Sequence, residues 1–135
     1  MRLILSIFTV SMLSLACCAQ DQSEFKKETF ISSTGLSLPY RILFPENYDK
    51  TKKYPVVLFL HGAGERGDNN ESQLVHGSKL FLDPANRKAY PAIVIFPQCP
   101  AESYWSSVKV NREKMPLELA FDYTRPITPA LQAAI

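Results

Sequence analysis

Residues 54–69 read YPVVLFLHGAGERGDN and join an unbroken apolar run to a loop that contains three glycines. The run, residues 54–60, is rich in β-branched and aromatic side chains. Such a run is typical of a strand buried on both faces, as in a parallel sheet covered by helices. The glycines allow backbone conformations and close approaches that side chains forbid. The stretch therefore predicts a buried strand that ends in a tight polar loop.

A second apolar run, AIVIF, occupies residues 92–96 directly after Pro91. Between the two runs, Asp83 followed by Pro84 is typical of a helix N-cap and first helical residue, and it predicts a short helix ending near Ala89. Two buried strands with helical material between them indicate a βαβ crossover. We therefore expect the two runs to lie parallel in one α/β sheet.

A hairpin is predicted before the first run. Residues 25–31 are β-prone and residues 32–35 form a turn cluster. After the turn, apolar side chains alternate with polar or small neighbours at Leu38, Tyr40, Ile42 and Phe44. This alternation predicts an antiparallel hairpin with that one face buried. Pro39 has no N–H for the ladder, so it favours an edge strand or a strand start.

The C-terminal part of the chain is less regular. Between Pro97 and Thr128 the pattern predicts no firm element. Thr128 and Pro129 again form a cap and first helical residue, and they predict a short helix that is marginal unless it packs well or continues.

The first residues have the pattern of an export signal. A positive start, MR, precedes an apolar segment over residues 3–15 and a small-residue zone, ACCA, over residues 16–19. The apolar segment is too short to span a membrane comfortably. We predict a signal peptide over residues 1–19 and a partial domain over residues 20–135.

Two processing outcomes for this signal stay open. Cleavage after Ala19 would release a soluble exported protein. The sequence around Cys17 and Cys18 also loosely resembles a bacterial lipobox, whose cysteine is lipidated. We therefore expect a periplasmic, extracellular or lipid-anchored protein, with membrane contact only through an N-terminal lipid anchor.

Charge and metal-binding residues exclude several classes of function. The balance of 15 Lys+Arg against 13 Asp+Glu contains no block of like charge, so no nucleic-acid partner is predicted. His61 and His76 match no metal-ligand spacing, and we predict neither a metal nor a cofactor. Cys99 is interpreted as a small buried residue and not a nucleophile, because nothing near it in sequence supplies a base.

Residues 62–67 also match the pattern G-x-G-x-x-G of dinucleotide-binding loops. That site requires a helix that begins inside the loop, so that its N-terminus meets the pyrophosphate. Residues 65–72 are polar or glycine and offer no apolar helical face. We therefore reject the dinucleotide interpretation.

The strand followed by His-Gly-x-Gly resembles the loop after the third strand of α/β-hydrolases, where a backbone N–H faces the oxyanion of a tetrahedral intermediate. The chain is similar to the N-terminal half of the exported bacterial carboxylesterase, phospholipase and dienelactone-hydrolase-like group, which includes predicted peptidases. The matching pieces are residues 38–41, residues 54–69, residues 96–100 and Trp105. The resemblance implies an α/β fold in which an antiparallel hairpin leads into parallel strands with crossover helices. It also implies a serine carboxyl-ester hydrolase.

The resemblance assigns roles within the loop. It implies that Ala63 donates an oxyanion-hole N–H and that Gly64 keeps the loop tight. It further implies that His61 is structural and not the catalytic base. The remaining polar residues are expected to hold the loop or line the substrate mouth, with simple solvation as the alternative for the charged ones. The loop-orienting residues would be His61, Gly62, Glu65, Arg66 and Asp68.

Trp105 and Tyr104 are candidates for a wall of the substrate pocket, because the family places an aromatic residue soon after its fourth strand. Core packing is the alternative role for both rings. The implied substrate is a small-molecule ester, and a lipid, an acylated sugar or a peptide-like compound are all compatible with the residues present.

An esterase of this fold also needs a G-x-S-x-G nucleophile elbow, an acid and a histidine, in that order. No such motif occurs in the 135 residues, and the only Gly-Ser step, at Gly77 and Ser78, lacks the second glycine. We expect a chain truncated before the nucleophile strand and inactive alone, with that strand flanking residues 92–96. The alternative is a non-catalytic secreted binding or accessory domain derived from the hydrolase fold.

Overall fold

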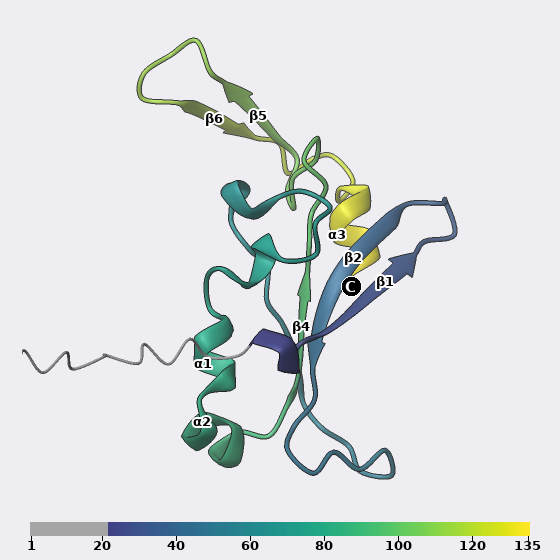
Figure 1. The fold of residues 1–135 in the computed structure, drawn as a ribbon. Helices are drawn as coiled ribbons and strands as arrows, with labels where there is room; N and C mark the ends of the chain where they lie inside the picture. Colours follow the sequence, from purple (N-terminus) through teal and green to yellow (C-terminus); the bar gives the residue numbers. More distant parts are fainter. Residues whose placement is uncertain (1–21) are drawn as a thin grey trace, which may run out of the picture.

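The computed structural model describes residues 22–135, and the predicted signal peptide lies outside the described residues. Six strands, three α-helices and three 3-10 turns (η) make up this part of the chain (Figure 1). In chain order they are η1 (Gln22–Glu24), β1 (Lys26–Ile31), β2 (Ser37–Leu43), β3 (Val56–Leu58), η2 (Ala63–Glu65), η3 (Ser72–Leu74), α1 (Ser78–Leu82), α2 (Pro84–Ala89), β4 (Ile93–Pro97), β5 (Val108–Asn111), β6 (Glu118–Phe121) and α3 (Pro129–Ala134).

Four strands form one mixed sheet in the order β1-β2-β4-β3. β1 and β2 pair antiparallel, as the hairpin pattern predicts, and β2 continues antiparallel onto β4. β3 and β4 pair parallel, with α1 and α2 in the connection between them. The predicted hairpin and the predicted βαβ crossover are therefore both present in the sheet.

The position of β4 corrects one expectation. β4 lies between β2 and β3, with Tyr40 opposite Pro97 on one side and Val57 opposite Val94 on the other. Both edges of β4 are thus occupied, so a further strand cannot flank it as expected. Within residues 22–135 the two edge strands are β1 and β3, and the free edge beside the glycine loop belongs to β3, because the crossover inserts β4 on the side of the hairpin.

β3 is also more exposed than its apolar sequence predicts. Only three of the seven residues of the apolar run form the strand, and Val56 is 62% exposed. The prediction of a strand buried on both faces is therefore wrong for the described residues. The physical reason is that β3 has a neighbour on one side alone in this part of the chain, which leaves apolar side chains of an edge strand uncovered.

The buried face of β2 was also predicted only in part. Leu38 is fully buried, but Tyr40, Ile42 and Phe44 are only half-buried. On the opposite parity, Arg41 and Leu43 are buried instead. Side chains of opposite parity point to opposite faces of a sheet, so β2 is covered on both faces. Figure 1 shows α1 and α2 on one side of the sheet and α3 beside β2 on the other.

The core between the sheet and α1 is built on aromatic rings. Phe96 of β4 is fully buried, stacks on Phe59 at 4.5 Å between ring centroids, and meets Phe25 edge-to-face at 5.2 Å. Phe81 of α1 approaches Phe96 edge-to-face at 5.7 Å. Such pairs add to the free energy gained by burying the rings themselves. The cluster fixes α1 and the end of β3 against the middle of the sheet.

Both predicted helix starts are confirmed. The Asp83 carboxylate accepts a hydrogen bond from the Asn86 amide at 3.0 Å, with Pro84 as the first residue of α2. The Thr128 hydroxyl accepts from the Leu131 amide at 3.2 Å, with Pro129 first in α3. The local cap chemistry therefore decides where each helix begins.

One element escaped the sequence prediction. β5 and β6 form a separate antiparallel hairpin that projects beyond the carboxyl ends of β3 and β4 (Figure 1). Its strands are only four residues long, so the alternation of apolar and polar residues is too brief to distinguish from loop sequence. No helix among residues 22–135 is long and apolar enough to cross a membrane.

The Asp83 cap is testable by substitution. Asp83→Ala removes the acceptor for the Asn86 amide, and we expect the free energy of unfolding to fall by about 1 kcal/mol. Denaturant titration followed by circular dichroism measures the change. Asp68→Ala is the matched control, because Asp68 is exposed and has no hydrogen bond or ion pair within the described residues. Equal stability of both variants would show that the cap contributes nothing.

Candidate functional site

The candidate site lies where β3 and β4 end. The glycine loop leaves β3 and forms η2, and residues 98–105 follow β4. Because β3 and β4 are parallel, their carboxyl ends meet at the same edge of the sheet. Ligands of open α/β sheets bind in the crevice outside these carboxyl ends. The fold therefore places the glycine loop where a ligand site is expected.

The His61 ring joins the two strand ends. Its Nε2 accepts a hydrogen bond from the Cys99 amide at 3.0 Å, and its Nδ1 lies 2.6 Å from the Gly62 carbonyl oxygen. A backbone amide can only donate and a carbonyl can only accept, so Nε2 carries no proton and Nδ1 carries one. The ring is 6% exposed and touches Trp105 edge-to-face at 5.2 Å. Both of its nitrogens are therefore occupied by backbone groups, which leaves neither free to act as a base.

Ala63 begins the η2 turn. The first amides of a helical turn have no acceptor within that turn. Among the described residues, neither the Ala63 amide nor the Gly64 amide donates a hydrogen bond, and both residues are exposed. The turn thus presents backbone N–H donors at the carboxyl end of β3. Such donors are the groups that stabilise a developing oxyanion.

A buried glutamine holds the far side of the loop. Gln98 is fully buried, and its Nε2 donates to the Glu65 carbonyl at 3.1 Å and to Asn69 Oδ1 at 2.8 Å. Its Oε1 accepts from the Asn70 amide at 2.7 Å. The Gly67 amide donates to the Cys99 carbonyl at 2.9 Å, and the φ of Gly67, 150°, is one that side-chain-bearing residues rarely adopt. The segment after β4 therefore fixes the loop at several points.

A buried arginine carries this network to the first hairpin. Arg41 of β2 donates from Nε to the Asn70 carbonyl at 2.6 Å and from Nη1 to the Phe25 carbonyl at 2.8 Å. Burial lowers the pKa of the Arg41 guanidinium, while the Glu71 carboxylate raises it. Arginine nevertheless stays charged in proteins, so its hydrogen bonds are charge-assisted.

Arg66 holds its own loop, and Glu65 reaches the segment after η3. Arg66 donates from Nε to the Ala63 carbonyl at 2.8 Å and from Nη1 to the Ser103 carbonyl at 2.9 Å. Its guanidinium also lies over the Tyr104 ring, 4.0 Å from the centroid. A Glu65 carboxylate oxygen lies 3.4 Å from Nε2 of the exposed His76. Asp68 instead lines a different hollow, together with Pro100 and Glu102.

A cavity of about 350 Å³ opens beside the loop. Most of the residues that the sequence analysis singles out line this cavity. Apolar side chains of the β5–β6 hairpin, which the sequence analysis did not predict, line it as well. The indole Nε1 of Trp105 donates to the His61 carbonyl at 3.1 Å, so the loop also holds this wall in place. The predicted residues that line the cavity are His61, Gly62, Ala63, Arg66, Tyr104 and Trp105.

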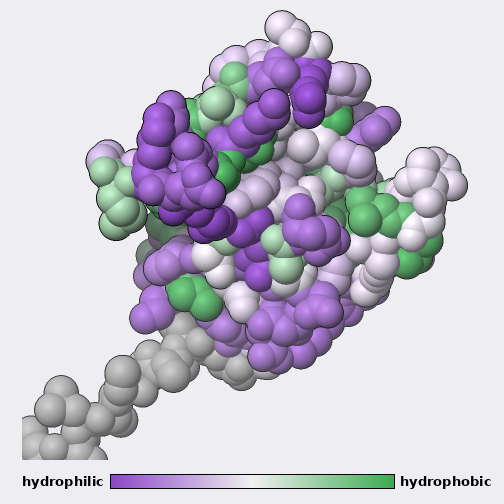
Figure 2. Space-filling model, turned by 90° about the horizontal axis from the view of Figure 1, so that it is seen from above, coloured by the Kyte–Doolittle hydropathy of each residue, from purple (hydrophilic) through white to green (hydrophobic). Residues whose placement is uncertain are grey.

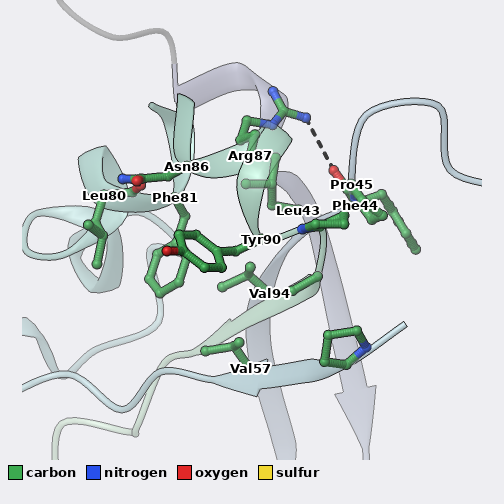
Figure 3. A pocket seen from close by; sticks show the side chains of 13 residues that line it. Leu43, Phe44, Pro45, Val57, Leu80, Phe81, Asn86, Arg87, Tyr90 and Val94 are labelled. Atoms are coloured by element: carbon green, nitrogen blue, oxygen red, sulfur yellow. Dashed lines mark hydrogen bonds between the residues drawn. The ribbon is translucent and has the colours of Figure 1, made fainter. Parts of the chain in front are cut away.

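A larger cavity, of about 710 Å³, lies at the other end of the sheet (Figure 3). Apolar side chains line it, including Phe44, Val57 and Tyr90, and Arg87 donates to the Phe44 carbonyl at its rim. This end holds the amino termini of β3 and β4. It lies away from the strand ends that bear ligand sites in α/β sheets, so its size does not make it the candidate site.

Cys99 is buried with a free thiol, and burial raises its pKa. A raised pKa means less thiolate at neutral pH, which disfavours a nucleophilic role. Among residues 22–135, no group of three or more His, Cys, Asp or Glu side chains is placed to hold a metal ion.

Comparison with known proteins finds similar solved structures among esterases. No protein-family profile matches the chain, and no curated protein matches it. A solved structure described as a thermostable esterase is 39% identical and superposes with a TM-score of 0.59. The match covers 63% of this chain and 24% of the esterase chain. The CE1 ferulic acid esterase AmCE1/Fae1A of the anaerobic fungus Anaeromyces mucronatus is 27% identical, with a TM-score of 0.45. This match covers 65% of this chain and 33% of the fungal chain.

The chain has an esterase-like hydrolase fold. The mixed sheet, the helices and the likeness to the thermostable esterase fit part of an α/β-hydrolase. The chain spans about a quarter of that esterase's length.

Three polar residues of the site region received no role in the sequence analysis: Gln98 and Arg41, which lie in the pieces that resemble the family, and Arg112. Gln98 follows a buried strand directly, and a polar side chain at such a position is a usable signal. Arg41 was counted as a polar partner of an alternating strand, and sequence alone does not show that it is buried. Arg112, whose Nη2 lies 3.2 Å from the Tyr104 hydroxyl, depends on a hairpin that the sequence does not reveal.

Removing the Gln98 amide tests how the loop is held. Gln98→Met keeps a similar volume and deletes three hydrogen bonds, so we expect a loss of about 3 kcal/mol in the free energy of unfolding at about 1 kcal/mol per bond. Denaturant titration gives the value. Gln132→Met, at an exposed position of α3, is the control and should change stability by less than about 0.5 kcal/mol. A Gln98→Met chain as stable as the control would contradict this account.

The tautomer of His61 is a second prediction. We expect the ring proton on Nδ1, because Nε2 accepts from the Cys99 amide. Nitrogen-15 NMR of the imidazole at neutral pH distinguishes the two tautomers. A proton found on Nε2 would show that the bridge between the two strand ends does not exist in solution.

Proposed function

We propose that this chain supplies the oxyanion-hole half of a carboxylic ester hydrolase. The observation that carries the proposal is the Ala63 amide, which donates no hydrogen bond among the described residues, while His61 and Gln98 hold the rest of its loop at the carboxyl end of β3. Fixed donors need no reorganisation during the reaction, which is the basis of this kind of catalysis. The likeness to a thermostable esterase supports the same assignment.

In the proposed reaction, a nucleophile adds to the ester carbonyl and the carbonyl oxygen becomes an oxyanion. The Ala63 amide donates a hydrogen bond to that oxygen, with Gly64 giving the loop its tight turn. Collapse of the intermediate breaks the bond to the alcohol oxygen, and water then releases the carboxylic acid. His61 positions the loop and takes no proton in this scheme.

The nucleophile, the acid and the catalytic histidine are proposed to come from sequence that follows Ile135. The free edge of β3 supports this arrangement, because a strand added there parallel to β3 would end beside the glycine loop. Side chains at the end of such a strand reach the same crevice as the glycine loop. The proposed protein would be an exported bacterial enzyme, soluble or lipid-anchored, with small esters as substrates.

The experiment is to sequence the gene through the codon for Ile135 and to assay its full product on short-chain 4-nitrophenyl esters. We expect an open frame that encodes G-x-S-x-G, and an active product. Ala63→Pro removes the amide proton and should lower kcat by about 100-fold or more, the usual effect of losing one oxyanion-hole donor.

Ala63→Gly keeps the amide proton and is the control, with kcat expected near that of the unchanged enzyme. A stop codon directly after Ile135 would overturn the enzyme proposal and favour a non-catalytic binding domain. An active product whose Ala63→Pro variant keeps full kcat would overturn the role of this amide.

A further inference from the structure

The β5–β6 hairpin has one apolar face that packs on no core cluster among residues 22–135. Val108 lies opposite Phe121 and Val110 opposite Leu119, and all four side chains line the cavity beside Ala63. The alternate positions are Lys109, Asn111, Glu118 and Ala120. Successive side chains of a strand point to opposite faces, so the ribbon has an apolar side toward the cavity and a mainly polar side away from it.

That apolar face is only half covered. Leu119 is 52% exposed and Phe121 is 48% exposed, although both line the cavity. Seen from above the hairpin end of the molecule, hydrophobic residues show between hydrophilic ones (Figure 2). Apolar surface that faces a hollow beside reactive backbone donors is a place for the apolar part of a ligand.

The charge of the cavity is positive. Its lining contains Arg66 and Arg112 and no carboxylate. The Tyr104 ring lies under the Arg66 guanidinium, and its hydroxyl accepts from Arg112 at 3.2 Å, so both cations contact one side chain. Each guanidinium has five N–H donors, and the hydrogen bonds within the described residues use two on Arg66 and one on Arg112.

We infer that this cavity binds the acyl part of the substrate, an apolar chain or ring that ends in a carboxyl group, and that the hairpin is its apolar wall. The inference rests on the proposed function and adds the acyl side as the part of the ester that is recognised. The apolar chain lies against Leu119 and Phe121. The carboxyl oxygens lie toward Ala63, Arg66 and Arg112, whose charge complements the carboxylate released by hydrolysis.

The chain contains a built-in probe for this site. Trp105 is its only tryptophan and lines the cavity. Titration with n-hexanoate, which does not absorb where indole does, should give a saturable change in tryptophan fluorescence, with calorimetry as an independent measure of binding. n-Hexylammonium has the same chain length and the opposite charge, and we expect it to bind at least roughly tenfold more weakly.

Substitutions separate the two parts of the site. Arg112→Gln should weaken hexanoate roughly tenfold and leave hexan-1-ol unchanged, because only the charged hydrogen bonds are lost. Leu119→Ser should weaken both ligands, because it removes apolar wall. Lys109→Gln is the matched control, since it removes a positive charge from the other face of the same hairpin, and it should leave both affinities unchanged.

Three results would overturn the inference: no hexanoate binding by either method, equal binding of hexanoate and hexylammonium, or hexanoate binding that Leu119→Ser leaves unchanged. Hexanoate binding is measured without turnover, so it is independent of the nucleophile. Selective binding by a gene product that hydrolyses no ester would overturn the proposed enzyme and support the acid-binding site. Ester hydrolysis by a gene product that does not bind hexanoate would support the proposed enzyme and overturn the acid-binding site.

Discussion

The rest of the site depends on one neutral imidazole that bridges the ends of two parallel strands. His61 ends the β3 run, and its ring meets the backbone that follows β4 through the Cys99 amide. Its Nδ1 donates to the Gly62 carbonyl at the start of the glycine loop. The backbone carbonyl of His61 accepts from the Trp105 indole. Strand pairing alone would leave these two loops independent. The bridge turns them into one rigid rim around the Ala63 amide.

Polar side chains, and not apolar packing, hold the outer part of this rim. Gln98 satisfies three loop groups, and Arg41 joins the loop to the first hairpin through the Asn70 carbonyl. Buried polar groups are costly unless they are paired, so a loop built this way has few alternative conformations. The Ala63 amide is left for a ligand, which is the property that an oxyanion hole requires.

Local chemistry made much of this predictable. The caps at Asp83 and Thr128 place two helix starts, and two apolar runs with a helix between them indicate a parallel pair. Long-range pairing was not predictable, because sequence pattern does not say which side of β3 receives β4. The buried Arg41 and the four-residue strands of the second hairpin escaped for the same reason, since burial and pairing depend on contacts distant in sequence. The glycine loop was predictable because its backbone conformations and close approaches require glycine, and glycines are visible in the sequence.

Amide hydrogen exchange in the native protein tests the central claim most directly. The account predicts that the amides of Gly67 and Cys99 are protected, because both donate within the rim. It predicts that the Ala63 amide, a few residues away, exchanges close to the rate of an unstructured peptide, because it has no acceptor among the described residues. Protection of Ala63 equal to that of Cys99 would mean that its donor is already used, and would contradict the oxyanion-hole assignment.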